Sequence, residues 1–337
     1  MTIRHNYSLK NLNTFGIDIR AKNFVELHSP GEIRQLLRQE TIDLNNTLIL
    51  GAGSNILFTG DYDGIIIKPL FDTIRIEKSY PDSVIVSAEA GLEWDKLVEW
   101  AVNRELGGLE NLSLIPGNVG AAPIQNIGAY GAEVSDCITG VQALSIENGE
   151  ALTFSNEECK FGYRDSVFKH ELKGKVLITR VEFRLKKAPY EYKLTYGGLD
   201  DRVKKKGEIN LPGIRHSVIE IRNEKLPDYT RLGNAGSFFK NPIIDREDYM
   251  NLKNTYEDIP GWKTEDNRYK IPAAWLIEKD GWKGKKYGDA GVHNKHALVL
   301  VNHGKASGME IMEMSDMIIR SVRDRFRIDL EREVNII

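Results

Sequence analysis

Residues 111–132 read NLSLIPGNVGAAPIQNIGAYGA, and this stretch decides the interpretation of the chain. It holds no Asp, Glu, Lys or Arg over 22 residues, whereas a chain that is 28% charged is expected to place about six there. Its four glycines and two prolines exclude a continuous helix or a regular strand. The N–H and C=O groups of an irregular apolar loop need partners when they are buried. We therefore expect either a large ligand bound by this backbone or a loop sandwiched between two domains.

The composition indicates a folded, intracellular protein. A chain of 337 residues that is 41% hydrophobic is long enough for two or three domains. Its net charge of −3 gives no electrostatic case for binding nucleic acid or a membrane surface. Cys137 and Cys159 form no C-x-x-C pair, which argues against a disulfide framework or a structural zinc site. The N-terminus lacks the apolar core of a signal peptide, so we expect the cytoplasm.

The first part of the chain predicts strands on either side of a glycine turn. Residues 29–32, Ser-Pro-Gly-Glu, form a capping box that predicts a short helix. The apolar runs 47–50 and 65–67 predict buried strands, and the turn Gly51-Ala52-Gly53-Ser54-Asn55 follows the first run. Ile56 stands where a dinucleotide fingerprint needs its third glycine, which excludes a Rossmann fold. Consecutive N–H groups in this turn can still form an anion-binding nest.

Hydrophobic periodicity predicts most of the remaining elements. We expect strands at residues 84–88, 141–146, 176–185, 297–301 and 334–337, and helices from residue 94 to the glycines at 107–108, at 273–279, and from about residue 307. Residues 186–189, Lys-Lys-Ala-Pro, interrupt this pattern, and we place the main domain boundary there.

Three polar residues lie in contexts that suggest chemistry, although each also has an ordinary explanation. Arg164, on a turn, could clamp a carboxylate or stabilise an oxyanion, or be a surface residue neutralised by Asp165. Ser237 lies between Gly236 and two phenylalanines, so its hydroxyl could have a chemical role or could simply cap a turn. Glu333 could be a solvated edge charge, or a general acid if burial keeps its proton.

The histidines His293, His296 and His303 do not match the spacing of a metal site, and polar contacts around the nearby strand explain them better. No P-loop, H-E-x-x-H or G-x-S-x-G motif occurs, which argues against nucleotide hydrolysis, zinc proteolysis and serine hydrolysis. We predict no metal.

Long motifs in a fixed order make the chain resemble the UDP-N-acetylenolpyruvoylglucosamine reductases, the MurB family. These motifs are residues 51–55, IPGNVGAAPIQNIGAYG at 115–131, GYRDS at 162–166, GNAGSFFKNP at 233–242 and LEREV at 330–334. The resemblance extends from about residue 11 to the C-terminus. The loop Thr195-Tyr196-Gly197-Gly198 resembles the type I branch, in which a tyrosine loop closes over the substrate.

The resemblance implies an α+β fold. Residues 1–188 would form an FAD-binding region of the PCMH or vanillyl-alcohol-oxidase type, with two α+β subdomains at about 1–70 and 71–188. Residues 189–337 would form an α/β substrate-binding domain whose C-terminal strand returns to the active site. The same resemblance implies a cytoplasmic flavoprotein of peptidoglycan precursor synthesis, and we expect a monomer.

The resemblance also implies roles for individual residues. Catalytic roles fall to Arg164, Ser237 and Glu333. Substrate-binding positions are Tyr196, Lys225, Asn241 and Lys283, with Tyr163 as a neighbour. Non-covalent FAD contacts fall to Gly51, Ala52, Gly53, Ser54, Asn55, Pro116, Gly117, Gly120, Ala121, Gln125, Asn126, Gly128, Ala129 and Tyr130. His296 stands where the family usually has glutamine, which puts a nucleotide contact from that position in doubt.

As the resemblance implies, NADPH reduces FAD and leaves, and the enolpyruvyl ether of a UDP-sugar then takes the same site. Flavin N5 would deliver hydride to the vinyl C3, Arg164 and Glu333 would stabilise the charge that builds on the carboxylate, and Ser237 would protonate C2.

Two other functions stay open at this point. One is an FAD-dependent oxidase or dehydrogenase of the same fold that acts on an alcohol or sugar. No histidine lies between His28 and His170, which disfavours the covalent flavin link of many such enzymes. The other is a catalytically silent UDP-sugar-binding protein, which the presence of all three candidate catalytic residues disfavours.

Overall fold

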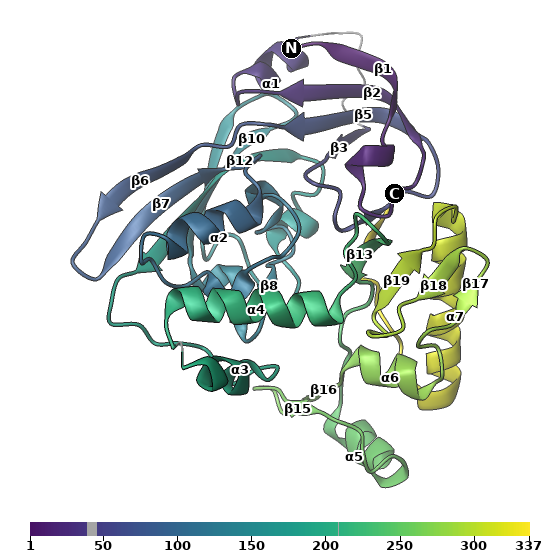
Figure 1. Cartoon of the computed structure of the whole chain (residues 1–337). Coiled ribbons are helices and arrows are strands. Elements are labelled where there is room, and N and C mark those ends of the chain that lie inside the picture. Colours follow the sequence, from purple (N-terminus) through teal and green to yellow (C-terminus); the bar gives the residue numbers. More distant parts are fainter. Residues whose placement is uncertain (39–45, 208) are drawn as a thin grey trace. The chain divides into compact units, whose positions relative to one another are not determined.

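The structure, a computed structural model, describes residues 1–38, 46–207 and 209–337 (Figure 1). Internal contacts divide the chain into two units, each built from several segments. Unit 1 contains Met1–Tyr7, Ala21–Ala52 and Asp63–Glu224; unit 2 contains Ser8–Arg20, Gly53–Tyr62 and Lys225–Ile337. The chain therefore passes from unit 1 to unit 2 inside the glycine turn, between Ala52 and Gly53.

The first sheet of unit 1 confirms the strands predicted beside the glycine turn. Its order is β1 (Ile3–Ser8), β2 (Arg20–Leu27), β5 (Tyr62–Pro69) and β3 (Thr47–Ile49). Strands β3 and β5 run parallel, with Thr47 opposite Ile65. Helix α1 (Glu32–Leu37) buries Ile33 and Leu36 against this sheet. The residues after the turn form β4 (Ile56–Leu57) and not a helix, which confirms the exclusion of a Rossmann fold.

The second sheet of unit 1 is antiparallel and longer. Its order is β11 (Ala151–Ser155), β10 (Ile138–Ser145), β12 (Val176–Lys186), β7 (Ser83–Glu89) and β6 (Ile74–Ser79). The strand predicted at residues 176–185 is confirmed as β12, and its alternate residues Val181, Phe183 and Leu185 are fully buried. Helix α2 (Trp94–Val102) packs its apolar face into the same core. It ends five residues before Gly107, because the chain turns at residues 103–106.

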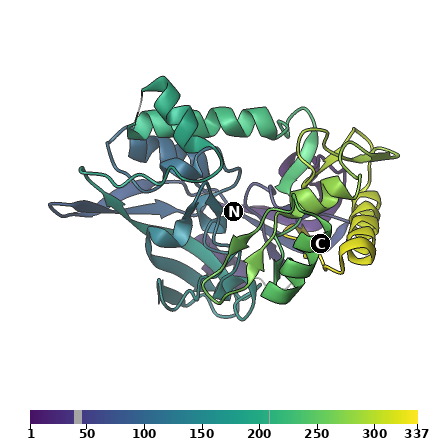
Figure 2. The ribbon, with the colours of Figure 1, turned by 90° about the horizontal axis from the view of Figure 1, so that it is seen from below.

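Short elements of the charge-free segment complete this core: the 3₁₀ turns η2 (Glu110–Leu112) and η3 (Val119–Ala121), and the two-residue strands β8 (Gly128–Ala129) and β9 (Ala132–Glu133). Three further 3₁₀ turns are η1 (Lys10–Leu12), η4 (Val134–Asp136) and η5 (Val167–Lys169). Helices α3 (Leu199–Lys206) and α4 (Leu211–Lys225) were not predicted; they share a small core with Tyr130. Figure 2 shows α4 as one long helix.

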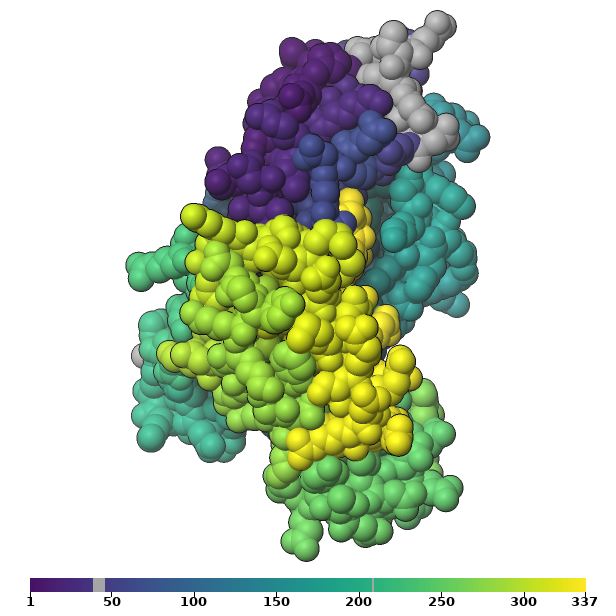
Figure 3. All heavy atoms as spheres, turned by 90° about the vertical axis from the view of Figure 1, so that its right-hand side faces the viewer, coloured from purple at the N-terminus to yellow at the C-terminus, as the bar shows by residue number. Residues whose placement is uncertain are grey.

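Unit 2 is built around a four-stranded antiparallel sheet in the order β13 (Gly233–Ser237), β19 (Val299–Asn302), β18 (Ala290–Val292) and β17 (Lys286–Tyr287). Helix α7 (Gly308–Phe326) packs against β18 and β19, and helix α6 (Ala273–Lys279) packs against α7. Figure 3 shows the C-terminal residues in yellow on the surface. Ser307 and Glu310 form the capping box that starts α7. A smaller part contains α5 (Arg246–Thr255) and the sheet β14 (Ile243–Ile244), β16 (Tyr269–Lys270) and β15 (Trp262–Lys263).

The end of the chain belongs to unit 2 together with the residues that follow the glycine turn. Strand β20 (Asn335–Ile336) runs parallel to β4, with Asn335 opposite Ile56. The predicted C-terminal strand is therefore confirmed, although it covers two residues. The structure combines helices with antiparallel sheets and with a sheet that contains parallel strands, which confirms an α+β fold. The boundary that we placed at residue 188 stays a prediction.

Candidate active site

The charge-free segment finds backbone partners in the short connection between β7 and α2. The N–H groups of Val119 and Gly120 donate to the carbonyls of Leu92 (2.8 Å) and Ala90 (3.0 Å). A Cβ on Gly120 would lie 2.6 Å from the Cβ of Ala90, so only glycine allows this approach. The irregular loop is thus fixed by backbone hydrogen bonds, and its glycines are needed for close packing as well as for turns.

An unused acceptor lies beside the first half of the glycine turn. The buried Oδ1 of Asn118 has no hydrogen-bond partner among the described residues, while its Nδ2 donates to the carbonyl of Gly91 at 2.6 Å. A Cβ on Gly51 would come within 3.1 Å of that oxygen and 3.8 Å of the Cβ of Ala121. A glycine cradle that keeps a buried acceptor open fits a ligand with N–H or O–H donors, such as FAD. Gly51 and Ala121 are two of the residues that sequence reasoning assigned to FAD, whereas Asn118 was missed.

The other half of the turn is tied to the C-terminus inside unit 2. The Asn55 side chain donates to the carbonyl of Glu333 (3.2 Å), and the N–H of Asn335 donates back to the carbonyl of Asn55 (3.1 Å). Thr14 donates its N–H to the carbonyl of Gly53 at 3.1 Å. Gly53 needs its small size, because its φ is +64° and a Cβ would clash with the backbone at Leu12.

Arg164 is brought against the charge-free segment within unit 1. It has a left-handed backbone (φ +56°) on a turn that two hydrogen bonds between Gly162 and Asp165 close. Its Nη2 donates to the carbonyl of Gly128 at 2.6 Å, and its guanidinium lies 5.3 Å from the ring centroid of Tyr163. Arg164 is therefore not a freely solvated surface residue. The carbonyl contacts fix the position of its charge beside residues assigned to FAD.

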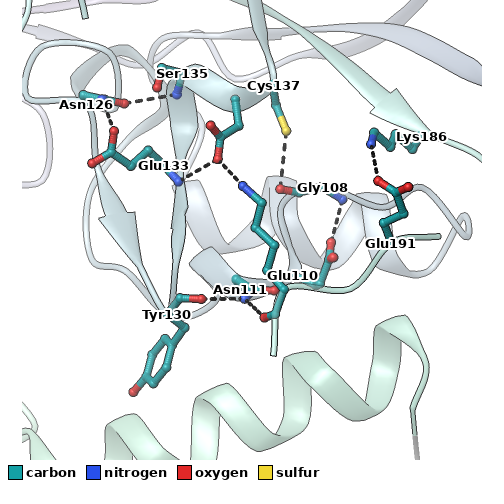
Figure 4. Close-up of polar contacts among 12 residues, drawn as sticks. Gly108, Glu110, Asn111, Asn126, Tyr130, Glu133, Ser135, Cys137, Lys186 and Glu191 are labelled. Carbon is teal, nitrogen blue, oxygen red and sulfur yellow. Dashed lines mark hydrogen bonds and ion pairs between the residues drawn. The ribbon is translucent and has the colours of Figure 1, made fainter. Parts of the chain in front are cut away.

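Asn126 supports this arrangement with its side chain (Figure 4). Its Nδ2 donates to Glu133 (2.8 Å) and to the carbonyl of Gly162 (3.0 Å), and its Oδ1 accepts the N–H of Ser135 (3.1 Å). Because the side chain is buried and hydrogen-bonded through both its nitrogen and its oxygen, it links the loop to the turn that carries Arg164. The other loop residues assigned to FAD lie in the same segment of unit 1: Pro116, Gly117, Gln125, Ala129 and Tyr130.

Ser237 and Glu333 are neighbours in unit 2. Ser237 is the last residue of β13 and pairs with Val299. The N–H of Glu333 donates to the carbonyl of Phe238, the next residue after Ser237, at 2.8 Å. Glu333 itself is half-buried and lies just before β20, outside any strand. One backbone bond therefore brings together two of the candidate catalytic residues that are 96 positions apart in sequence.

Two candidate substrate-binding lysines of unit 2, Lys225 and Lys283, lie near a neutral histidine. Lys283 pairs with Glu278 at 2.9 Å, and Asn241 accepts the N–H of Ala273 at 2.9 Å. Burial, together with the nearby charges of Lys225 and Lys283, lowers the pKa of His296 to about 4.

His296 also has a defined tautomer. Its Nδ1 accepts the N–H of Leu298 at 3.3 Å, so the neutral ring carries its proton on Nε2. Among the parts of the chain that the structure describes, no cluster of three His, Cys, Asp or Glu residues could hold a metal ion. Within the same residues, no helix is long and apolar enough to cross a bilayer.

The predicted site residues thus divide between the two units. Unit 1 holds Gly51, Ala52, the charge-free loop, Tyr163, Arg164 and Tyr196. Unit 2 holds Gly53, Ser54, Asn55, Lys225, Ser237, Asn241, Lys283 and Glu333. The sequence signal that could have identified Asn118 is the occurrence of polar amides in a loop that otherwise lacks charge.

Comparison with known proteins identifies the family. Residues 21–155 match the FAD binding domain model, and residues 227–337 match that of the UDP-N-acetylenolpyruvoylglucosamine reductase C-terminal domain. The chain is 44% identical to the UDP-N-acetylenolpyruvoylglucosamine reductase of Flavobacterium johnsoniae, covering 100% of both chains. It is 45% identical to that of Bacteroides fragilis, covering 98% of this chain and 99% of the relative. Its fold matches the crystal structure of MurB from Thermus caldophilus with a TM-score of 0.69 and 24% identity, covering 99% and 98% of the two chains. The chain therefore belongs to the family of UDP-N-acetylenolpyruvoylglucosamine reductases.

Proposed function

We propose that this protein reduces the enolpyruvyl ether of a UDP-sugar to the UDP-N-acetylmuramate product, with NADPH as the reductant and non-covalently bound FAD as the carrier. The observation that carries the proposal is the full-length match to UDP-N-acetylenolpyruvoylglucosamine reductases. The chain also has Arg164, Ser237 and Glu333 at the positions that the family resemblance implies. The proposal places the reaction in cytoplasmic synthesis of peptidoglycan precursors by a monomer.

When bound, FAD supplies the hydride chemistry that no amino-acid side chain provides. Gly51 and Ala121, with the open acceptor of Asn118 between them, would hold one part of it in unit 1. The N–H groups around Ser54 in unit 2 would receive an anionic group as a nest.

Arg164 and Glu333 would stabilise the charge that develops on the substrate carboxylate during reduction. The Arg164 guanidinium is already oriented, because the carbonyl of Gly128 accepts from one of its nitrogens. A donor that is held in place before the reaction needs no reorganisation when charge appears. Glu333 would act in its protonated form, as the donor of a hydrogen bond to the carboxylate.

Ser237 would donate the proton of its Oγ to C2 of the substrate, while hydride adds to C3. A serine hydroxyl is a weak acid in water, so this role requires a fixed geometry and exclusion of solvent. Its position at the end of β13, beside the buried rings of Phe238 and Phe239, supplies a rigid, apolar support.

An anaerobic two-step flavin titration tests the proposal. NADPH should bleach the yellow protein, and the enolpyruvyl UDP-sugar should restore its colour. We expect Ser237→Ala and Glu333→Gln to leave bleaching intact and to slow recolouring by orders of magnitude. Glu331→Gln is the matched control, because its side chain is 69% exposed and pairs with Lys240.

Three outcomes would contradict the proposal. Protein that stays colourless with excess FAD would refute the cofactor, and recolouring by oxygen but not by the UDP-sugar would favour an oxidase. Normal recolouring in Ser237→Ala would remove this residue from the mechanism. Equal slowing of both steps in Glu333→Gln would indicate a structural role.

A further inference from the structure

A half-buried lysine lies behind the glycine turn in unit 1. Lys68, near the end of β5, donates from Nζ to the carbonyl of Gly51 at 2.7 Å. Burial lowers the pKa of its ammonium group, and within the described residues no carboxylate forms an ion pair with it. The charge of Glu26 acts on Lys68, but the ion pair of Glu26 is with Arg4. Removing an ammonium group from water without a carboxylate partner costs free energy, so we looked for a role other than stability.

The sheet brings this lysine to the start of the turn. Strands β3 and β5 run parallel with Ile49 opposite Ile67, and the N–H of Leu50 still donates to the carbonyl of Ile67 at 2.9 Å. At the next residue the backbone pairing ends, and the carbonyl of Gly51 accepts from the Lys68 side chain instead. The lysine is therefore bound at the point where β3 passes into the turn.

The bond to Lys68 also sets the direction of an N–H group. The peptide group between Gly51 and Ala52 is planar and trans, so its N–H points away from its C=O. Since the carbonyl is directed at Lys68, the N–H of Ala52 is directed to the opposite side, where no described residue accepts it. A cation on the carbonyl side polarises the peptide group and strengthens its N–H as a donor.

An open acceptor lies beside the same glycine. The Oδ1 of Asn118 would be 3.1 Å from a Cβ on Gly51, and it has no partner among the described residues. A ligand that satisfies both groups needs negative oxygens for the Ala52 N–H and hydroxyl donors for the Asn118 amide. The diphosphate of FAD supplies the oxygens, and the ribityl and ribose groups on either side of it supply the hydroxyls.

We propose that Lys68 is a positioning residue for FAD, which acts through the Gly51–Ala52 peptide group to direct the N–H of Ala52 at an oxygen of the diphosphate. Backbone N–H groups fixed in this way bind phosphate oxygens, and a positive charge behind them adds to the attraction. Lys68 acts from the carbonyl side and makes no contact of its own with the cofactor. The inference deepens the proposed function, because both require FAD at the glycine turn.

Rebinding of FAD to the deflavinated protein tests this role. Lys68→Met removes the charge and the bond to Gly51, and we expect Kd for FAD to rise about 10-fold. Lys68→Arg keeps a positive donor and should recover part of the affinity. As a competitor of FAD, inorganic pyrophosphate should bind about 10-fold more weakly to Lys68→Met than to the wild type. Riboflavin, which lacks phosphate, should compete equally well in both proteins.

Lys22→Met is the matched control for loss of a lysine charge from the same sheet. Lys22 lies on β2, its side chain is 63% exposed, and it pairs with Asp63 at 2.8 Å. FAD and pyrophosphate should bind to this variant as they do to the wild type. Should Lys68→Met fail to fold, Lys68→Gln makes the same comparison, because it removes the charge and keeps a side chain that can donate. We expect a smaller loss of affinity from it.

Phosphorus NMR and thermal unfolding separate this role from a general loosening of the turn. In FAD-bound Lys68→Met the phosphorus resonances should move, while the visible spectrum of the flavin stays the same. Without FAD, the variant should unfold at the same temperature as the wild type or higher, because a poorly compensated charge is removed. FAD should then raise the Tm of the variant less than that of the wild type.

Three results would overturn the inference. One is an unchanged Kd for FAD in Lys68→Met, or in Lys68→Gln where the first variant does not fold. Another is equal weakening of riboflavin and pyrophosphate, which would indicate a structural role. The third is a changed flavin spectrum with unmoved phosphorus resonances, which would place the effect of Lys68 on the ring. Because these measurements do not depend on turnover, bleaching by NADPH and recolouring by the UDP-sugar remain a separate test of the proposed function.

Discussion

His296 should contribute to the pH dependence of the stability of unit 2, and replacing it by glutamine should remove that contribution. Burial and the nearby charges of Lys225, His293 and Lys283 lower its pKa from 6.5 to about 4, and Glu278 opposes this effect. Between these two pH values the unfolded chain binds a proton at this position and the folded chain does not. Stability therefore rises with pH in this window: it is complete above 6.5 and is lost as the pH falls toward 4.

The size of the effect follows from the lowered pKa. Moving from pH 7.5 to pH 4.5 should cost the wild type about 2 kcal/mol through His296, after allowance for partial exposure of the ring. In His296→Gln this contribution is absent, whereas the titrations of other groups remain. The difference between the two proteins in free energy of unfolding should therefore change by about 2 kcal/mol over this pH range.

Urea unfolding of the FAD-bound wild type and of His296→Gln at both pH values measures this difference. NMR of histidine-labelled protein should place the neutral proton on Nε2, because Nδ1 accepts from Leu298. Lys225→Met should raise the pKa of His296, since one of the charges that lower it is removed. This account of His296 would be refuted if the wild type and His296→Gln differed in free energy of unfolding by the same amount, within about 0.5 kcal/mol, at pH 7.5 and at pH 4.5.

Three further substitutions test the packing and the cofactor cradle. Gly120→Ala should destabilise unit 1 by about 1–3 kcal/mol because its Cβ would clash with Ala90, whereas Gly60→Ala, with open space around it, should be neutral in the same thermal unfolding assay. Asp95→Asn should cost about 3 kcal/mol in urea unfolding, because it leaves a partly buried arginine of α4 unpaired; a loss below about 1 kcal/mol would contradict a stabilising pair. Asn118→Ala should weaken rebinding of FAD to the deflavinated protein by about 5-fold, and unchanged affinity would show that its open acceptor faces no part of the cofactor.

Much of the fold could be predicted because it depends on local periodicity. Strand β12 has its apolar residues on one face, and that face is buried in the structure. Helix α7 begins at the capping box of Ser307 and Glu310, and Ile311, Met314 and Ile318 are buried as the helical spacing predicts. In both cases the signal lies within a few residues of the element that it determines.

Helix α4 could not be predicted in this way. Its first residues are Leu211, Pro212 and Gly213, a sequence that is typical of a turn. Proline is nevertheless tolerated in the first helical turn, where its missing N–H has no helical partner to lose. Packing of Leu211, Ile214, Val218 and Ile221 against other parts of unit 1 stabilises the helix. Tertiary contacts, and not a local sequence signal, therefore determine this helix.

The arrangement around Ser237 and Glu333 could be predicted only through the family resemblance, because its hydrogen bonds join residues far apart in sequence. Asn55 donates to the carbonyl of Glu333, 278 positions later, and Glu333 donates to that of Phe238. No local pattern contains such a contact. Since Gly53 to Asn55 belong to unit 2 and Gly51 and Ala52 to unit 1, the two halves of the glycine turn are held by different cores. A substitution at Asn55 should therefore disturb the C-terminal residues before it disturbs the charge-free loop. Amide hydrogen exchange can detect this order. If the turn is divided in this way, the substitution should speed exchange at Asn335 and leave exchange at Val119 unchanged.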